Sequence, residues 1–176
     1  MIDTILVPTD GSKHANKALD LASDLAVGYG ARLVILHVLL RDAMAGDLKR
    51  LIKFDRLSKD IRDEIDDIHD IADTITTMGG VYPPFPVPPS TRVLGAVGNE
   101  IAEEAREAAA ARGVKDIRVE VIGGRPAKRI LDAADETHAD MIVMCSRGLG
   151  EVEGLFVGSV SHKVSHLSKC TCVTVK

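Results

Sequence analysis

The chain has 176 residues, of which 45% are hydrophobic, and a formal net charge of −4. This length and composition predict one soluble globular domain with a sizeable core. The acidic balance gives no reason to expect a nucleic-acid partner, and an aromatic content of 3% leaves few platforms on which bases could stack. Because there is no Trp, the core must consist of Val, Ile, Leu and Ala, as in parallel sheets.

Neither a membrane span nor a signal peptide is predicted. No apolar run reaches the roughly 18 residues that a span requires, and the first residues lead straight into a strand. Three cysteines without a C-x-x-C pair are typical of a reducing compartment. We therefore expect a cytoplasmic protein without a membrane partner. The scattered histidines and cysteines predict no metal site.

The first 39 residues predict a strand, a helix and a second strand. Residues 5–7 are an apolar strand that Pro8 is expected to stop, and the next four residues form a turn with helix-capping side chains. Apolar residues then recur at spacings of three and four up to Tyr29, which predicts an amphipathic helix, and residues 33–39 form the second strand. Such a unit predicts a parallel pair of strands with a right-handed crossover.

Residues from about 41 to 93 interrupt this alternation. Apolar residues at steps of three and four predict a long helix over about 43–78, with its bases in the first part and its acids in the second. That order opposes the helix dipole, but two antiparallel copies would bring opposite charges together. An oligomer contact, and a solvated helix that lies over its own domain or is split in two, therefore both stay open. The Pro-rich residues 81–90 predict an extended connector.

The rest of the chain resumes the alternation. The pattern predicts helices over 99–112, 126–137 and 158–168, and strands over 117–122, 141–144 and 171–175. Five strands alternating with four helices predict an α/β fold with a doubly wound parallel sheet. In such sheets ligands bind beyond the carboxyl ends of the strands, near the reversal of strand order. The turns after the first four strands are therefore expected to converge on one crevice.

A glycine-rich segment links the predicted fourth strand to the last helix. Glycines let the backbone approach a ligand closely, and the first turn of a helix offers unpaired N–H groups to an anion. No lysine follows a G-x-x-x-x-G spacing, and the glycines are one residue out of step with the dinucleotide fingerprint. Gly158, Ser159 and Ser161 are predicted to supply backbone donors and two hydroxyls to phosphate.

Gly148 is followed by nine residues and then by Gly158-Ser159. This spacing resembles the nucleotide-binding signature of the universal stress protein family, which reads G-x-x-G, nine residues, G-[ST]. Four more segments resemble the family in order, I-L-V-P-T-D-G-S at 5–12, L-V-I-L-H-V at 33–38, G-R-P-A at 124–127 and D-M-I-V-M at 140–144. The resemblance covers residues 1–40 and 94–176. It implies the Rossmann-like fold of adenine nucleotide alpha hydrolases, as one domain over 1–176 with a helix and connector inserted at about 41–93, after the second strand.

The resemblance also implies the ligand and its contacts. The expected ligand is ATP, ADP or AMP, with Mg²⁺ or Mn²⁺ held mostly by phosphates and water. The matching positions are Pro8, Thr9 and Asp10 for ribose and adenine, Val38 for adenine, Met144, Cys145 and Gly148 for the loop wall, and Gly158, Ser159, Val160 and Ser161 for phosphates. Cys145 replaces the first glycine of the signature. If that glycine serves φ > 0, the cysteine strains the backbone by about 1 kcal/mol, and if it serves ligand contact, the side chain obstructs the pocket; both alternatives stay open. For Asp10 and Ser12, capping of the first helix stays open as a second role.

The function implied is that of a nucleotide-binding regulator or sensor in the stress response, with no catalytic residue. The resemblance also implies a homodimer through residues 171–175, which would cover an otherwise unpaired strand edge. Two alternatives stay open. One is a slow ATPase or nucleotidyl transferase, for which no general base beside the terminal phosphate is evident. The other is a ligand-free dimeric interaction module.

Overall fold

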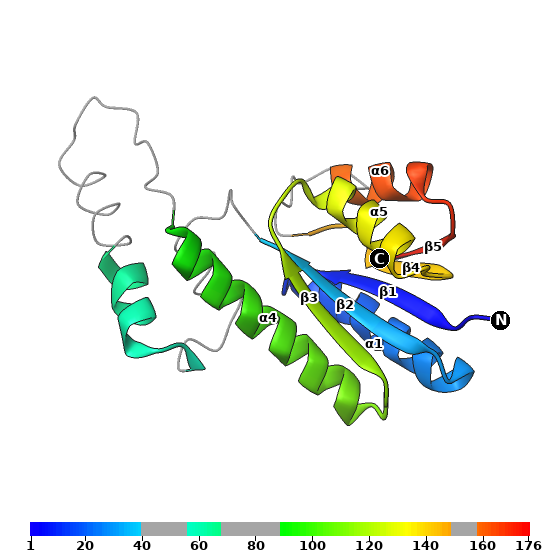
Figure 1. Ribbon diagram of the computed structural model, residues 1–176, viewed down its shortest axis with the longest axis horizontal. Coiled ribbons are helices and arrows are strands. Elements are labelled where there is room, and N and C mark those ends of the chain that lie inside the picture. The colour runs from blue at the N-terminus through cyan, green and yellow to red at the C-terminus, as the bar shows by residue number, and fades with distance from the viewer. Residues whose placement is uncertain (40–55, 68–88, 149–157) are drawn as a thin grey trace. The chain divides into compact units, whose positions relative to one another are not determined.

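The computed structural model describes residues 1–39, 56–67, 89–148 and 158–176. It divides into two compact units, one formed by Met1–Val38 with Ile101–Lys176 and the other by Leu39–Glu100. The elements in order are β1 (Thr4–Thr9), α1 (Lys13–Tyr29), β2 (Arg32–Val38), α4 (Thr91–Ala111), β3 (Ile117–Ile122), α5 (Pro126–Glu136), β4 (Met141–Cys145), α6 (Ser159–Leu167) and β5 (Thr171–Val175) (Figure 1). No helix in the described ranges has both the length and the apolarity to cross a bilayer.

The first unit contains a five-stranded sheet in the order β3-β2-β1-β4-β5, with every neighbouring pair parallel. The chain starts at the centre of the sheet, adds β2 and β3 on one side, and then adds β4 and β5 on the other. The predicted doubly wound α/β fold is confirmed. Its strand order reverses between β1 and β4, which is where such sheets bind ligands.

Helices cover both faces of the sheet. One core cluster joins one face of the strands to α1 and to Ala105 and Ala109 of α4, and the second joins the opposite face to α5 and α6 (Figure 1). β1 and β2 are buried on both faces, which explains why they are nearly continuous apolar runs. The buried hydrophobic side chains of the described residues are those of Ile, Leu, Val, Ala and Met. The expected aliphatic core is thus confirmed for this part of the chain.

Two predicted boundaries are wrong. Pro8 does not stop β1, which continues to Thr9. The hydrogen-bond ladder between β1 and β4 ends at Leu6, so the missing N–H of Pro8 breaks no bond on the side that faces β4. The helix predicted from residue 99 begins at Thr91 instead. Ser90 caps it by accepting the N–H of Val93 at 3.2 Å. Glycines lower helix propensity at the start of this helix, which hid it from the sequence pattern.

The helix predicted over 43–78 is not continuous, as in the alternative of a helix split in two. Residues 57 and 58 are not helical, and residues 59–67 form a helix whose first turn donates to the carbonyl of Ser58, from Ile61 and Arg62 at 3.1 Å each. Leu57, Ile61 and Ile65 are buried, so this helix has an apolar face. The remainder of the predicted helix and the connector at 81–88 lie outside the described residues.

Candidate functional site

β1 and β4 part at their carboxyl ends. Their ladder consists of Ile5 opposite Met141 and Leu6 opposite Ile142, although each strand runs on for three more residues. On the other side of β1, pairing with β2 continues to Thr9. The reversal of strand order therefore coincides with the point at which the ladder between two neighbouring strands ends. A crevice of this kind is the general ligand position in open α/β sheets.

The turn after β1 is held by its own side chains. The Thr9 hydroxyl accepts the N–H of Gly11 at 3.2 Å, and Asp10 Oδ1 accepts the N–H of Ser12 at 3.0 Å. Gly11 has φ +79°, and Ile101 lies 3.3 Å from the position that a Cβ would occupy there. Ser12 caps α1 by accepting the N–H of Ala15 at 3.1 Å. The capping role thus belongs to Ser12, whereas Asp10 stabilises the turn before the helix.

The Asp10 carboxylate faces the segment that follows β4. A Cβ at Gly148 would overlap Asp10 Oδ2, so a larger residue here would require the Asp10 carboxylate to shift. The two residues are far apart in the sequence, and the fold brings them close together at the carboxyl edge of the sheet. The structure thus brings together Asp10 and Gly148, two of the residues that the sequence assigned to one site.

The start of α6 is tied to the end of β4. Ser146 is the acceptor at this junction: its carbonyl accepts the Gly158 N–H at 2.7 Å and the Ser161 hydroxyl at 2.8 Å. Ser161 is 3% exposed and also donates to the Gly158 carbonyl at 3.0 Å. The hydroxyl of Ser161 therefore supports the turn, while Ser159 is exposed. Ser146 was missed by the sequence analysis, although its position directly after an apolar strand was a signal.

The helices differ in how they begin. α1 is capped by a side chain, whereas the N-cap residues of α6 and α5, Gly158 and Arg125, make no side-chain cap bond. The unsatisfied N–H groups of a first turn, together with the helix dipole, attract anions. At Gly158 an added Cβ would lie 3.1 Å from the Ser146 carbonyl, so glycine permits the close approach that orients this turn. The start of α6 can therefore receive an anion at the carboxyl edge of the sheet.

Cys145 neither strains the backbone nor faces the α5 and α6 side of the sheet. Within the described ranges the non-glycine residue with positive φ is His138, so position 145 does not require glycine for its backbone. The thiol is half-buried and packs with the core cluster on the α1 face. Burial, and next the charge of Asp10, raise the pKa of Cys145 to about 11. The strain expected at this position is therefore wrong.

Several other predicted ligand residues are buried or partly buried. Val38 and Met144 are 7% and 4% exposed, and both belong to the cluster on the α5 and α6 face. Pro8 is buried within β1, and Val160 is partly buried in the first turn of α6. These residues present mainly backbone to the carboxyl edge, where the strands end.

The turn after β3 depends on a different glycine. Gly124 has φ +140°, and a Cβ there would lie 2.6 Å from Nε of Arg129. This nitrogen donates to the Gly123 carbonyl at 2.9 Å. The glycine lets the arginine fold back over the turn, which holds the start of α5 at the same edge of the sheet as the start of α6.

His37 is a buried polar residue beside the site that the sequence analysis did not single out. Its ring is 1% exposed, and Nδ1 lies 3.0 Å from the Thr9 carbonyl. Burial lowers the pKa of His37, and the hydrogen bond to Thr9 opposes this shift. The signal in the sequence was a polar residue inside the apolar run of the second strand.

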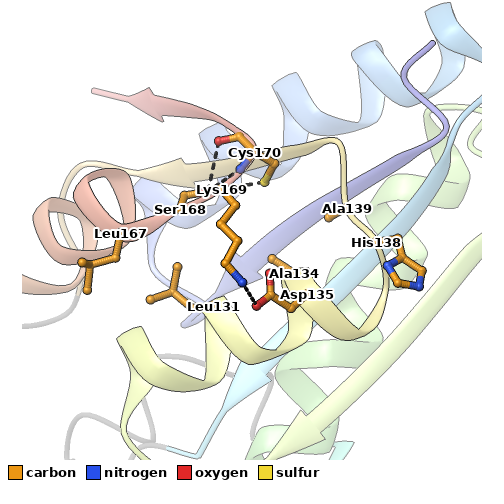
Figure 2. A pocket seen from close by; sticks show the side chains of 9 residues that line it. All are labelled: Leu131, Ala134, Asp135, His138, Ala139, Leu167, Ser168, Lys169 and Cys170. Atoms are coloured by element: carbon orange, nitrogen blue, oxygen red, sulfur yellow. Dashed lines mark hydrogen bonds and ion pairs between the residues drawn. The ribbon is translucent and has the colours of Figure 1, made fainter.

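A separate cavity of about 250 Å³ lies at the opposite edge of the sheet (Figure 2). Its lining includes Ala139, just before β4, and Cys170, just before β5, so it opens at the amino ends of these strands. The Lys169–Asp135 ion pair, 2.7 Å long, crosses it (Figure 2). None of the predicted ligand residues lines this cavity. Within the described ranges, moreover, no group of three or more His, Cys, Asp or Glu residues is arranged to hold a metal ion.

Comparison with known proteins agrees with this architecture. The model of the universal stress protein family matches residues 1–176. Universal stress protein YxiE of Bacillus subtilis is 34% identical, and a universal stress protein of Thermus aquaticus is 33% identical, in each case with all of both chains covered.

Solved structures show the same fold. A universal stress protein in complex with cAMP is 26% identical, with a TM-score of 0.61 and coverage of 99% of this chain and 97% of that one. The universal stress protein of Archaeoglobus fulgidus in complex with dAMP is 19% identical, with a TM-score of 0.60 and full coverage of both chains. On the family match over its whole length and the identity to curated relatives, the chain belongs to the universal stress protein family.

Proposed function

We propose that this protein binds an adenine nucleotide, with ATP as the first candidate, in the crevice between the ends of β1 and β4. The observation that carries the proposal is the contact of Asp10 with Gly148 where these strands part. The uncapped start of α6, which favours anions, lies at the same edge of the sheet. The cAMP complex of the 26% identical family member supports the choice of an adenine nucleotide.

Each end of the nucleotide has a set of contacts in this proposal. Asp10 accepts hydrogen bonds from ribose hydroxyls, because a carboxylate is a strong acceptor and a ribose offers only hydroxyl donors there. The proposed contacts fall into three sets. The adenine and ribose side consists of Pro8, Thr9, Asp10 and the backbone of Val38. The loop wall consists of Met144, Cys145 and Gly148, and the phosphate side consists of Gly158, Ser159, Val160 and Ser161. The Gly158 N–H and the Ser161 hydroxyl keep their bonds to the Ser146 carbonyl and so act on phosphate by holding the turn.

A divalent cation would arrive with the nucleotide. Mg²⁺ and Mn²⁺ bind phosphate oxygens and complete their shells with water, so this mode requires no cluster of protein carboxylates. The protein would then act as a regulator or sensor in the stress response, with nucleotide occupancy as the signal. We propose the cytoplasm as its location, which is supported by three cysteines that are all free thiols.

Calorimetric titration of the purified protein with ATP, ADP, AMP and cAMP tests the proposal, together with chromatography of any nucleotide released when the protein is denatured. We expect saturable binding of at least one adenine nucleotide. We also expect phosphate release from bound ATP to be much slower than nucleotide binding and dissociation. The absence of binding by all four at millimolar concentration would refute nucleotide binding. Rapid phosphate release from bound ATP would support an ATPase instead of a sensor.

A further inference from the structure

His37 connects β2 to the turn that carries Asp10. It lies directly opposite Thr9 in the register of β1 and β2, and its ring is 1% exposed. Its Nδ1 is 3.0 Å from the Thr9 carbonyl oxygen. Because a carbonyl can only accept a hydrogen bond, Nδ1 is the donor and carries the proton of the ring.

This hydrogen bond acts on Asp10 through the peptide plane. The Thr9 carbonyl and the Asp10 nitrogen belong to one planar peptide group, so fixing the carbonyl oxygen fixes the direction in which residue 10 leaves the strand. The bonds from Gly11 to Thr9 and from Ser12 to Asp10 are local to the turn and would move with it. The bond from His37 comes from the neighbouring strand, and so it fixes the position of the turn relative to the sheet.

The direction of Asp10 sets its distance from the segment after β4. The Asp10 carboxylate lies where a Cβ of residue 148 would be, so a rotation of the turn changes how closely Asp10 approaches the segment after β4. By the alternation of a strand, His37 shares its face of the sheet with Leu33 and Ile35, which belong to the aliphatic core. Burying a polar ring there is less favourable than burying a leucine. Packing alone therefore does not explain a histidine.

We propose that His37 is a positioning residue for nucleotide binding, which orients the Thr9–Asp10 peptide so that the Asp10 carboxylate meets the ribose hydroxyls. This inference rests on the proposed function and adds to it a residue that makes no contact with the ligand. Burial lowers the pKa of His37, which keeps the ring neutral at physiological pH and leaves the proton on the nitrogen that faces Thr9.

Three substitutions separate the position of the donor from the bulk of the side chain. His37→Asn places an amide N–H near the position of Nδ1, His37→Gln places it near Nε2, and His37→Leu removes it. In calorimetric titration with the best-bound nucleotide, we expect His37→Asn to stay within about threefold of the wild-type Kd. We expect His37→Gln and His37→Leu to raise Kd about tenfold, the effect of losing one oriented contact. Equal affinities in all three variants would overturn the inference.

A double-mutant cycle separates positioning from a general structural role. If His37 acts through Asp10, then His37→Leu will change Kd little in a protein that already carries Asp10→Ala, because the group it orients is gone. If the two substitutions raise Kd by independent factors that multiply in the double variant, the inference is overturned. A rise in Kd that follows a fall in Tm would also overturn it. Should His37→Leu not fold, the comparison of His37→Asn with His37→Gln decides. A wild-type protein that binds no nucleotide refutes the proposed function itself, whereas a wild-type protein that binds, with unchanged variants, refutes only the role of His37.

Discussion

At the scale of single residues, the site depends on groups that have almost no freedom to change. Gly148 touches Asp10, and Gly158 lies against the Ser146 carbonyl; in both places the absence of a Cβ sets how closely two segments approach. The reason for glycine is therefore contact rather than backbone conformation. Cys145 shows the contrast, since its φ does not demand glycine and its side chain packs with the core on the α1 face.

Gly148→Ala is predicted to weaken nucleotide binding by at least tenfold, because the new methyl group must displace the Asp10 carboxylate from its place in the crevice. Isothermal titration measures the loss. The matched control is Gly95→Ala on α4, where nothing lies within 4 Å of the new Cβ. That exchange should leave Kd unchanged and stabilise the protein by up to about 1 kcal/mol through helix propensity. A Kd for Gly148→Ala equal to that of the control would show that the contact does not shape the site.

Cys145 is predicted to be a slow thiol. With a pKa of about 11, only about a thousandth of it is thiolate at pH 8, and the thiolate is the reactive form. Alkylation by iodoacetamide, followed site by site with mass spectrometry, should therefore proceed more slowly at Cys145 than at a free thiol, and should accelerate as the pH rises toward 11. The denatured protein is the control, because unfolding removes the burial and the neighbouring Asp10 charge. Rapid labelling of native Cys145 at pH 7 would contradict the raised pKa.

At the scale of elements, β1 and β4 are tied at one end and open at the other. Asp140 Oδ2 accepts the N–H groups of Asp3 at 2.7 Å and Thr4 at 3.0 Å, and the Asp140 N–H donates to the Thr4 carbonyl at 2.9 Å. The ladder follows directly and ends after two pairs. One carboxylate thus holds the amino ends of two strands together while their carboxyl ends diverge around the candidate site.

Stability is predicted to fall with acid partly through Asp140. The two backbone N–H groups hold its pKa below the ordinary value, so the native state favours the ionised form. This contribution is present above the unfolded pKa, near 4, and is lost as the pH falls through the folded one. Asp140→Asn should therefore be less stable than wild type at pH 7, with a difference that shrinks below about pH 4. Urea unfolding at several pH values measures it.

The matched control for this experiment is Asp116→Asn. Asp116 forms an exposed ion pair with Arg32 at 2.9 Å. Its substitution by Asn removes the same charge at the same edge of the sheet. Exposed pairs contribute little to stability, so its effect at pH 7 should be the smaller of the two. If the two substitutions cost the same at every pH, then the strand-tying role of Asp140 is wrong.

At the scale of the whole molecule, β5 offers an edge for assembly. It is the last strand of the sheet, and an apolar edge strand tends to pair with another chain. The Thr171 N–H donates to the Asp140 carbonyl, and the Val175 carbonyl accepts the Ser146 N–H, so both groups face β4. The alternate residues 172 and 174 therefore direct their backbone groups outward. We propose a homodimer through this edge; the segment at 41–93 remains a second candidate contact.

Thr174→Pro is predicted to dissociate the dimer at micromolar concentration, because it removes an outward N–H from the edge while leaving the bonds to β4. Light scattering after gel filtration measures the mass. Thr174→Val, which keeps the N–H, is the control and should remain dimeric. A wild-type monomer, or a Thr174→Pro variant that stays dimeric with its native Tm, would contradict pairing through β5.

The alternation of apolar strands and amphipathic helices was enough to determine the fold, because the period of hydrophobic residues reports which faces must be buried. The boundaries that failed, at Pro8, at Thr91 and at Ser58, are those where neighbouring strands or capping bonds outweigh local propensity.

For the site, the sequence determined which turns follow which strands, and hence the edge of the sheet at which ligand residues gather. Only the tertiary structure decided that Asp10 meets Gly148, that the Ser161 hydroxyl is engaged with Ser146, and that His37 holds Thr9. The physical reason is that these contacts join residues far apart in the chain. Their geometry depends on where β1 and β4 stop pairing, and no local pattern encodes that point.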